Sequence, residues 1–313
     1  MSLNRNSFVS NIKVIKELNP FLITGFCDAE GCFTIIVPVK SKTRWKVKAS
    51  FEINLHVKDL DILYKIKCYF KEIGNIYIRK NRDICVYRVN TVKDLNDIII
   101  PHFNKYELLT QKQSDFLLWA KIVKKMLLKE HLTEKGFHYI LTLYASINKG
   151  ISKKVFQYFS DIKPIKKIIT KLPNKLNPNW VSGFVAGDGS FVLGLRKQEN
   201  NSKIFRIYYS FSVTQHSRDF NLIKLLTTFF DCGVAKIRYN KKTLRCDYLV
   251  QDINSIQNKI IPHFEKYSLN NIKELDFLDF KLVIDIIGSK KHLEIHNQVI
   301  ITNIINRMNH KRN

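Results

Sequence analysis

Two acidic residues, Glu30 and Asp188, end two similar short segments of the chain. The first segment runs from Leu22 to Gly31 and the second from Val181 to Gly189, so the acids are 188 − 30 = 158 residues apart. Carboxylates are oxygen ligands of the kind that hard divalent cations such as Mg²⁺ prefer. Two carboxylates held together repel each other unless a cation joins them, so this pair could hold a metal ion. For either acid alone, the end of an exposed surface helix is the simpler explanation.

Each segment has the signals of a short helix. The tripeptide Leu-Asn-Pro precedes both, which puts Asn19 or Asn177 at the N-cap and a proline at the first helical position. Each segment stops at a glycine, Gly31 or Gly189, where we expect a left-handed C-cap. The sequence therefore predicts two helices that carry a carboxylate in the last turn, where the helix dipole adds negative potential.

Small residues recur four positions apart within both predicted helices. Gly25 and Ala29 lie on one face of the first helix, and Gly183 and Gly187 lie on one face of the second. Small residues on facing stripes let two helix backbones approach closely. We predict that these four residues form the interface between two halves of the protein, and that the packing brings the two acids together at one end.

The charge of the chain indicates a polyanionic partner. Its 313 residues include 52 Lys and Arg but 27 Asp and Glu, a formal net charge of +25, and 45% of the residues are hydrophobic. A folded protein this basic usually binds nucleic acid. The alternatives are a basic protein without such a partner, or a membrane-surface protein, which would need a basic amphipathic helix that we do not find. No apolar run approaches the roughly 20 residues that cross a bilayer. We expect the six cysteines to be reduced, buried thiols in an intracellular protein.

The chain contains an internal repeat that extends well beyond the two helices. Residues 51–56 match 211–216 at an offset of 160, and residues 99–106 match 260–267 at an offset of 161. Such order and length indicate one unit used twice. We predict an N-terminal leader at 1–17, a first repeat at 18–150, a Lys-rich linker at 151–175 and a second repeat at 176–313.

Alternating hydrophobicity predicts four strands in each repeat. The first repeat has them near 32–40, 45–53, 75–80 and 84–90, with helices at 58–72, at 92–100 before Pro101, and at 110–129. The second repeat has strands near 191–197, 206–214, 234–239 and 244–250, with helices near 218–231, 253–260 and 271–287. The predicted fold class is α+β, with two αββαββα units related by pseudo-twofold symmetry, each with one antiparallel four-stranded sheet.

These motifs resemble the single-chain LAGLIDADG homing endonucleases, in the branch that fungal mitochondrial introns encode. The resemblance rests on the segments 26–33 and 184–191 and on the repeated Pro-His-Phe-x-Lys-Tyr block, and it covers the chain from about Leu18 onward. It implies a monomer whose two sheets form a saddle on double-stranded DNA. It also implies metal-dependent cleavage of both strands of a long, pseudo-palindromic target across the minor groove, leaving short 3′ overhangs, and a mitochondrial, organelle-encoded origin.

The resemblance also implies roles for particular residues. Glu30 and Asp188, with the backbone of Ala29 and Gly187, would hold Mg²⁺ or Mn²⁺, and Ca²⁺ would bind without supporting cleavage. Three polar side chains would assist catalysis near the metal: Lys112, its repeat equivalent Lys273 and Gln215, which replaces Leu55 of the first repeat. For the lysines, an ordinary surface position at a helix start is the alternative.

Two differences between the repeats predict unequal halves. Asp28 has Ala186 as its counterpart, so we expect a local hydrogen bond for Asp28 in place of metal ligation. The shorter Asp188 stands opposite the longer Glu30, and we expect one DNA strand to be nicked faster. His102 and His263 are predicted to be packed structural residues.

The outward strand faces are the predicted DNA-binding surface, where side chains would contact base edges or phosphates. The candidates are Thr34, Lys40, Lys46, Lys48, Ser50, Tyr77, Arg79, Lys80, Arg82, Arg88, Ser190, Arg196, Lys197, Arg206, Tyr208, Ser210, Ser212, Lys236, Arg238, Arg245 and Asp247. Two other functions fit the same fold: an RNA maturase that assists intron splicing, and a DNA-binding protein that has lost cleavage. Retention of both acids argues against the second, whereas a basic surface suits RNA as well as DNA.

Overall fold

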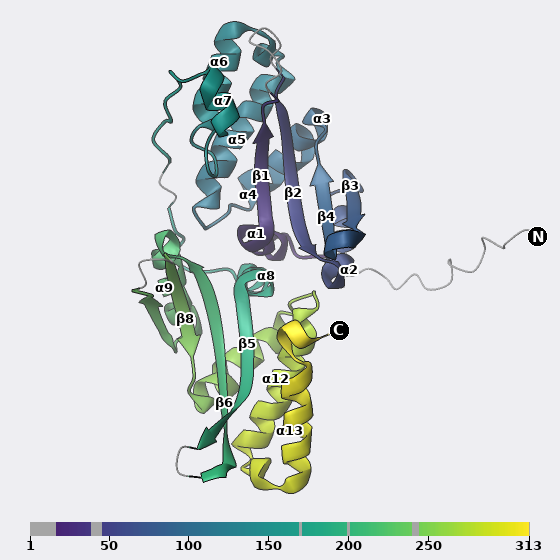
Figure 1. Ribbon diagram of the computed structural model, residues 1–313, viewed down its shortest axis with the longest axis vertical. Helices are drawn as coiled ribbons and strands as arrows, with labels where there is room; N and C mark the ends of the chain where they lie inside the picture. The colour runs from purple at the N-terminus through teal and green to yellow at the C-terminus, as the bar shows by residue number, and fades with distance from the viewer. Residues whose placement is uncertain (1–16, 39–45, 169–170, 199–200, 240–243, 313) are drawn as a thin grey trace, which may run out of the picture.

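Two similar halves lie one above the other along the long axis of the computed structural model (Figure 1). The structure describes residues 17–38, 46–168, 171–198, 201–239 and 244–312. The first half contains β1 (Gly31–Ile36), β2 (Lys48–His56), β3 (Asn75–Arg79) and β4 (Ile84–Val89), and the second contains β5 (Gly189–Gln198), β6 (Asn201–His216), β7 (Val234–Ile237) and β8 (Arg245–Val250). The strand orders are β1-β2-β4-β3 and β5-β6-β8-β7, and all the pairings are antiparallel. The predicted pair of four-stranded sheets is confirmed.

Helices cover one face of each sheet and leave the other face open (Figure 1). The first half contains α1 (Pro20–Glu30), α2 (Leu60–Tyr69), α3 (Val92–Asp94), α4 (Ile100–Lys105), α5 (Lys112–Leu127) and α6 (Glu134–Tyr144), and α7 (Lys153–Tyr158) lies in the predicted linker. The second half contains α8 (Pro178–Asp188), α9 (Phe220–Phe230), α10 (Ile253–Ser255), α11 (Ile261–Lys266), α12 (Lys273–Gly288) and α13 (Ile295–Arg307). The helices α6, α7 and α13 are not among those predicted from the sequence. A search of the described helices finds none that is long and apolar enough to span a membrane.

The core of each half lies between the sheet and its helices. Phe33 of β1 packs against four aromatic rings, with ring centroids 5.1 to 5.4 Å from its own: Phe51, Phe103, Phe116 and Trp119. Phe51 and Phe103 also contact each other, with centroids 5.6 Å apart. The second half repeats this cluster with Phe191, Phe211, Phe264, Phe277 and Phe280. Aromatic contacts of this kind add to the free energy gained by burial.

The two motif helices start as predicted but end differently. Asn19 accepts a 3.0 Å hydrogen bond from the Phe21 amide, and Asn177 accepts one of 2.9 Å from the Asn179 amide. Gly31 and Gly189 are extended, with φ of −72° and −84°, so the predicted left-handed C-caps are wrong. Both helices pass directly into strands, and glycine is needed there for space: a Cβ on Gly189 would lie 2.5 Å from Val185 Cγ1.

Pro101 does not end a helix at 92–100, as the sequence predicted. The chain stays helical from α3 through a π-helical segment, Leu95–Ile99, into α4, and Pro262 occupies the same place between Ile256–Ile260 and α11. Proline has no N–H to donate to the preceding turn, and the wider π turn removes the need for that hydrogen bond. The helix therefore continues past the proline.

Candidate active site

Helices α1 and α8 pack with their backbones in close contact at the junction of the two halves (Figure 1). A Cβ on Gly25 would lie 2.0 Å from the Trp180 carbonyl oxygen, and a Cβ on Gly183 would lie 2.0 Å from that of Leu22. Nearer the C-terminal ends, a Cβ on Gly187 would lie 2.3 Å from the Ala29 Cβ. Any side chain at these glycines would force the helices apart, so the small residues fix how closely the halves approach.

This packing brings Glu30 and Asp188 together. A Cβ on Gly187 would lie 3.3 Å from Glu30 Oε1, so the Glu30 carboxylate lies against the last turn of α8, beside Asp188. Burial, with the neighbouring Glu30 charge, raises the pKa of Asp188 to about 6. Burial also raises the pKa of Glu30, and Lys112 and Lys273 partly oppose this shift. Within the part of the chain that the structure describes, the Glu30 carboxylate accepts no hydrogen bond.

A lysine from each half donates to the end of a motif helix. Lys112 Nζ lies 2.9 Å from the Cys27 carbonyl oxygen and 3.2 Å from that of Ala29. Lys273 Nζ donates to the carbonyls of Val185, Gly187 and Gly189 at 3.0, 2.7 and 2.7 Å. Ammonium groups are favourable at these helix C-termini because of the helix dipole, although the Cys27 and Val185 carbonyls also accept the amides of Gly31 and Gly189. Burial lowers the pKa of Lys273 to about 8, against the attraction of Asp188 and Glu30.

Gln215 contacts one acid of the pair. Its Nε2 donates a 2.8 Å hydrogen bond to Asp188 Oδ2, and its Oε1 accepts from the His216 amide. Leu55, its counterpart, is buried and has no polar group to offer Glu30. The surroundings of the two acids are therefore chemically different.

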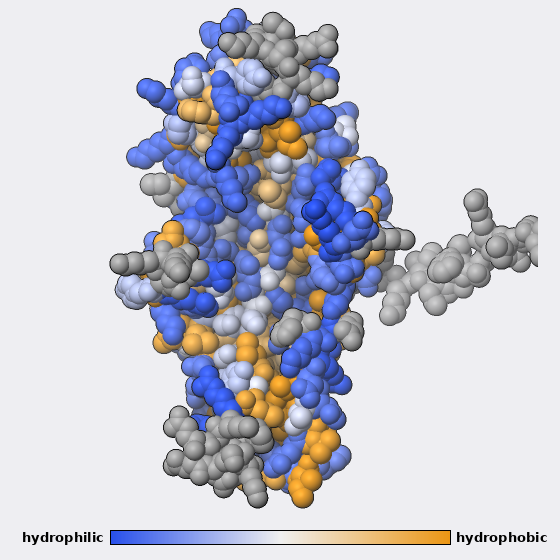
Figure 2. All heavy atoms as spheres, viewed as in Figure 1, coloured by the Kyte–Doolittle hydropathy of each residue, from blue (hydrophilic) through white to orange (hydrophobic). Residues whose placement is uncertain are grey.

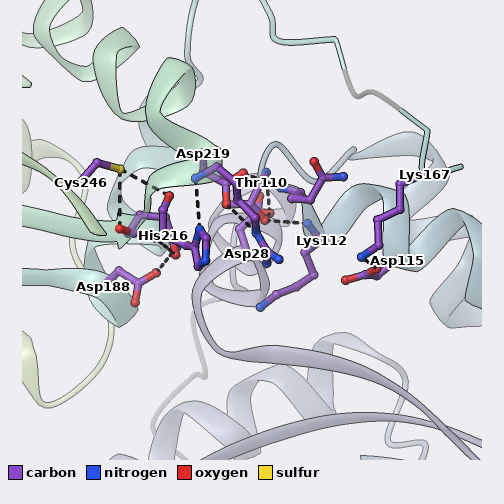
Figure 3. A network of polar contacts seen from close by, with 12 residues as sticks. Asp28, Thr110, Lys112, Asp115, Lys167, Asp188, His216, Asp219 and Cys246 are labelled. Carbon is purple, nitrogen blue, oxygen red and sulfur yellow. Dashed lines mark hydrogen bonds and ion pairs between the residues drawn. The ribbon is translucent and has the colours of Figure 1, made fainter. Parts of the chain in front are cut away.

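Asp28 forms hydrogen bonds, but not the local one that the sequence predicts: its partners are 81, 82 and 152 positions away, and one of them lies in the other half. Its carboxylate accepts from the amides of Leu109 and Thr110 at 2.8 and 3.0 Å, from the Thr110 hydroxyl at 2.6 Å, and from Trp180 Nε1 at 2.8 Å. Figure 3 shows Asp28 and Thr110 beside Lys112. The side chain is 2% exposed and its four donors lie close around it, so it is a structural residue here and does not point at the acid pair.

Two further aspartates, Asp59 and Asp219, were missed by the sequence analysis. Asp59 Oδ1 accepts from the Ile272 amide at 3.1 Å, and Asp219 Oδ1 accepts from the Gln111 amide at 2.7 Å. Both bonds join one half to the other. The signal was present, because each aspartate stands three residues after a matched histidine, His56 or His216, at the repeat offset of 160.

No group of three or more His, Cys, Asp or Glu side chains that could hold a metal occurs among the described residues. A divalent cation at the acid pair would therefore have two carboxylates and backbone carbonyls as its protein ligands. His102 is buried, with Nε2 3.2 Å from the Thr24 hydroxyl and Nδ1 3.1 Å from that of Tyr69, and His263 lies 3.2 Å from the Ser182 hydroxyl. The prediction that these histidines are packed residues is confirmed. All six cysteines are free, but contrary to the predicted burial Cys68 is exposed and Cys32 and Cys232 are only half-buried.

Most of the candidate DNA-binding side chains lie on the open faces of the sheets. Exposed members are Lys46, Lys48, Tyr77, Arg79, Arg82, Arg196, Arg206, Tyr208, Lys236, Arg238 and Arg245, and half-buried members are Thr34, Arg88, Ser190, Ser210 and Ser212. Lys40 and the side chains of Lys80 and Lys197 lie outside the described residues. Figure 2 shows hydrophilic atoms over much of the visible face, with hydrophobic patches toward its lower end.

Ser50 and Asp247 are nearly buried, at 7% and 6% exposure, so they are not the exposed DNA-contact residues that the sequence predicts. The Ser50 hydroxyl donates a 2.7 Å bond to Glu52, which also pairs with Arg88. Asp247 pairs with Arg238 and accepts a 2.6 Å bond from the Thr214 hydroxyl. Ser50 is thus satisfied within its own strand and Asp247 by Thr214 of the adjacent strand β6 and by Arg238, and alternation along one strand does not predict either contact.

A family model described as LAGLIDADG endonuclease matches residues 23–123 and 181–284. Probable intron-encoded endonuclease 2 of Neurospora crassa is 37% identical over 290 residues, which cover 88% of this chain and 62% of that protein. Probable intron-encoded endonuclease 3 of the same organism is 34% identical over 297 residues, or 93% and 54% of the two chains. This chain thus spans less than two thirds of the length of these two relatives.

Solved structures match over nearly the whole chain. The LAGLIDADG homing endonuclease I-GzeII in complex with its DNA target has a TM-score of 0.87 at 36% identity, covering 95% of this chain and 100% of that one. I-SmaMI bound to cleaved DNA has a TM-score of 0.88 at 36% identity, with coverage of 95% and 98%. I-SmaMI bound to an uncleaved target in the presence of calcium ions also has a TM-score of 0.88 at 36% identity, with coverage of 93% and 99%.

Proposed function

Because this chain belongs to the LAGLIDADG endonuclease family, we propose that it is a site-specific homing endonuclease that breaks both strands of double-stranded DNA. The observation that carries the proposal is the convergence of Glu30 and Asp188 from separate halves, between two sheets with open basic faces. The target would be long and pseudo-palindromic because two similar but unlike half-surfaces read it. Cleavage would leave short 3′ overhangs, as in the family.

The acid pair fits a divalent cation. Two half-buried carboxylates with raised pKa values lie side by side, and one of them has no hydrogen-bond donor in the described structure. A bound Mg²⁺ or Mn²⁺ would supply charge neutralisation at the phosphate and a more acidic water. Glu30 and Asp188 would hold it, with the carbonyls of Ala29 and Gly187, each of which has a second lone pair besides the one that a lysine uses. Carboxylate and carbonyl oxygens suit these hard cations and also Ca²⁺, which we expect to bind without supporting cleavage.

The lysines would act on charge and orientation. Lys112 and Lys273 place ammonium groups at the ends of α1 and α8, where negative charge develops on a phosphate during hydrolysis. Gln215 orients Asp188 and leaves Glu30 without an equivalent partner. This difference supports unequal nicking of the two strands.

The open sheet faces would bind the target. Arg196 lies 4.8 Å above the Tyr208 ring and Arg88 lies 5.8 Å from the Tyr77 ring, so aromatic residues orient two of the arginines on these faces. Guanidinium groups can donate to guanine edges or to phosphates, which makes such positions suitable for both binding and specificity. The relatives in Neurospora crassa are named as intron-encoded, so we propose a mitochondrial, organelle-encoded origin. Both sheets belong to one chain, so we also propose that the protein acts as a monomer.

The test uses the purified chain and a randomised duplex library. With Mg²⁺ or Mn²⁺, the wild-type protein should yield a cleaved consensus, and with Ca²⁺ it should bind the same sequence without cutting it. Glu30→Gln and Asp188→Asn should retain DNA binding and lose cleavage, whereas Asp61→Asn, at an exposed site on α2, should cut normally. Recovery of no cleaved sequence from wild type would refute the nuclease function, and selective binding of intron RNA would then favour the maturase.

A further inference from the structure

The turns after β2 and β6 have the same construction in both halves. His56 Nδ1 accepts from the Lys58 amide at 3.2 Å, and His216 Nδ1 accepts from the Arg218 amide at 3.1 Å. Each turn ends in an aspartate, Asp59 or Asp219, whose side chain points into the opposite half. The two turns are thus a symmetric pair, built at the end of a strand that also carries candidate DNA-binding residues.

Each aspartate holds the residue directly before a lysine of the acid-pair site. Asp59 binds the amide of Ile272, the N-cap of α12, and Lys273 follows it. Asp219 binds the amide of Gln111, the N-cap of α5, and Lys112 follows it. The first amides of a helix have no partner within the helix, and a carboxylate at that end is favourable. Neither N-cap side chain makes a capping hydrogen bond of its own, so the N-cap amide of each helix takes its acceptor from the other half, while the Lys112 amide also donates to the Thr110 hydroxyl of its own half.

Each lysine is fixed at two points: the aspartate of the opposite half binds the residue before it, and its own ammonium group binds the end of a motif helix. Beyond Ile272, Lys273 donates to three carbonyls at the end of α8, and beyond Gln111, Lys112 donates to two carbonyls at the end of α1. A lysine therefore lies between its own motif helix and a turn of the opposite sheet. Asp219 is 8% exposed and burial raises the pKa of both aspartates, so neither group is an ordinary solvated surface acid.

We propose that Asp59 and Asp219 are reciprocal positioning residues, each of which orients the lysine of the opposite half. This inference rests on the proposed nuclease function. Binding of the first sheet to its half-site would then change the position of Lys273 through β2 and Asp59. Binding of the second sheet would change the position of Lys112 through β6 and Asp219. Correct binding of both half-sites would be needed before either strand is cut rapidly.

The experiment measures the cleavage rate of each strand separately, under single-turnover conditions. The substrate is the duplex recovered from the randomised library, with a different dye on the 5′ end of each strand. Lys112→Met and Lys273→Met first establish which strand depends on which lysine. Asp59→Ala should then slow the Lys273-dependent strand about 5-fold more than the other, the size expected for loss of a helix cap. Asp219→Ala should show the opposite bias.

Further variants and measurements distinguish the loss of lysine positioning from a general loss of folding. Asp59→Asn and Asp219→Asn keep an acceptor oxygen and should restore most of the lost rate, while Asp61→Ala is the matched control and should show no bias. Hydrogen exchange is measured without DNA. The Ile272 amide should exchange faster only in Asp59→Ala, and the Gln111 amide only in Asp219→Ala. The double variant Asp59→Ala/Lys273→Met should be no more biased than Lys273→Met alone.

Equal slowing of both strands by Asp59→Ala and Asp219→Ala would overturn the inference and leave the nuclease function intact. The inference would also be overturned if both aspartate variants slowed the same strand more, or if the lysine variants slowed both strands equally. A wild-type protein that cuts no duplex would overturn the nuclease function, and this inference with it.

Discussion

The indole Nε1 of Trp180 donates a 2.8 Å hydrogen bond to the Asp28 carboxylate, across the interface of α8 and α1. The repeat equivalents of these residues are Leu22 and Ala186, both buried. One side of the pseudo-twofold interface is therefore polar and hydrogen-bonded, and the matching side is apolar. Without Asp28, the buried Trp180 Nε1 would have no acceptor in the described structure, whereas Asp28 without Trp180 would keep its three donors from Leu109 and Thr110.

Trp180→Phe should lower the free energy of unfolding by about 2 kcal/mol, because it removes a donor from a buried carboxylate and leaves a small void. Thermal or urea unfolding measures the effect. Asp28→Ala should cost more, because it leaves the amides of Leu109 and Thr110 without their acceptor. A Trp180→Phe protein as stable as wild type would show that the bond contributes little.

Gly183→Ala should prevent the normal packing of the two halves. The added Cβ would lie 2.0 Å from the Leu22 backbone carbonyl, which cannot move without shifting α1. We expect a loss of about 3 kcal/mol or more in unfolding free energy, the range of severe packing mutations. Gly288→Ala is the control: it meets only the flexible end of Gln257 and should be neutral. Equal stabilities for the two variants would contradict this account of the interface.

Asp188→Asn should stabilise the metal-free protein at pH 7.5. Folding brings the Asp188 carboxylate into a half-buried position beside Glu30, which raises its pKa from 3.8 to about 6. A shift of this size corresponds to a cost of up to about 3 kcal/mol that the neutral amide avoids. Differential scanning calorimetry in EDTA should show a higher Tm for the variant, and no change for Asp61→Asn. A lower Tm would contradict the raised pKa of Asp188.

The contribution of the two buried histidines, His102 and His263, to the free energy of unfolding should fall as the pH drops below about 6.5. Burial lowers the pKa of His102 to about 3 and that of His263 to about 4, so the folded state keeps both neutral while the unfolded chain takes up protons. The stabilisation is complete above the unfolded pKa and is lost as the pH falls toward the folded values. At pH 5 each histidine should cost roughly 2 kcal/mol. Urea titrations of His102→Gln should show a weaker loss than wild type between pH 6.5 and 5, and an unchanged slope would contradict the assignment.

Arg206→Ala should weaken DNA binding and reduce the slope of log Kd against log salt by about 1 if this side chain contacts a phosphate. Arg206 is exposed on β6, on the open face of the second sheet. Lys121→Ala is the control, because it removes an exposed charge from α5 on the opposite side of the first sheet. Fluorescence anisotropy at several salt concentrations measures both slopes. The same change in slope for both variants would show that binding does not use the sheet face.

The sequence by itself determined the elements that local patterns encode. Asn19 and Asn177 specify where α1 and α8 begin, and alternation specifies the eight strands, because capping and periodicity are properties of neighbouring residues. The repeat added one nonlocal fact: duplicated positions meet across a pseudo-twofold axis. That symmetry was enough to predict that Glu30 and Asp188 converge.

The tertiary structure decided the contacts between segments that are distant along the chain. The hydrogen bond of Asp247 depends on Thr214 in the adjacent strand β6, and the bonds of Asp59 and Asp219 depend on residues 213 and 108 positions away. Gly31 is extended because β1 follows α1 at once, which a glycine at a helix end does not reveal. A local pattern predicts on which face of an element a side chain lies, but the group that it contacts there depends on how distant segments pack together.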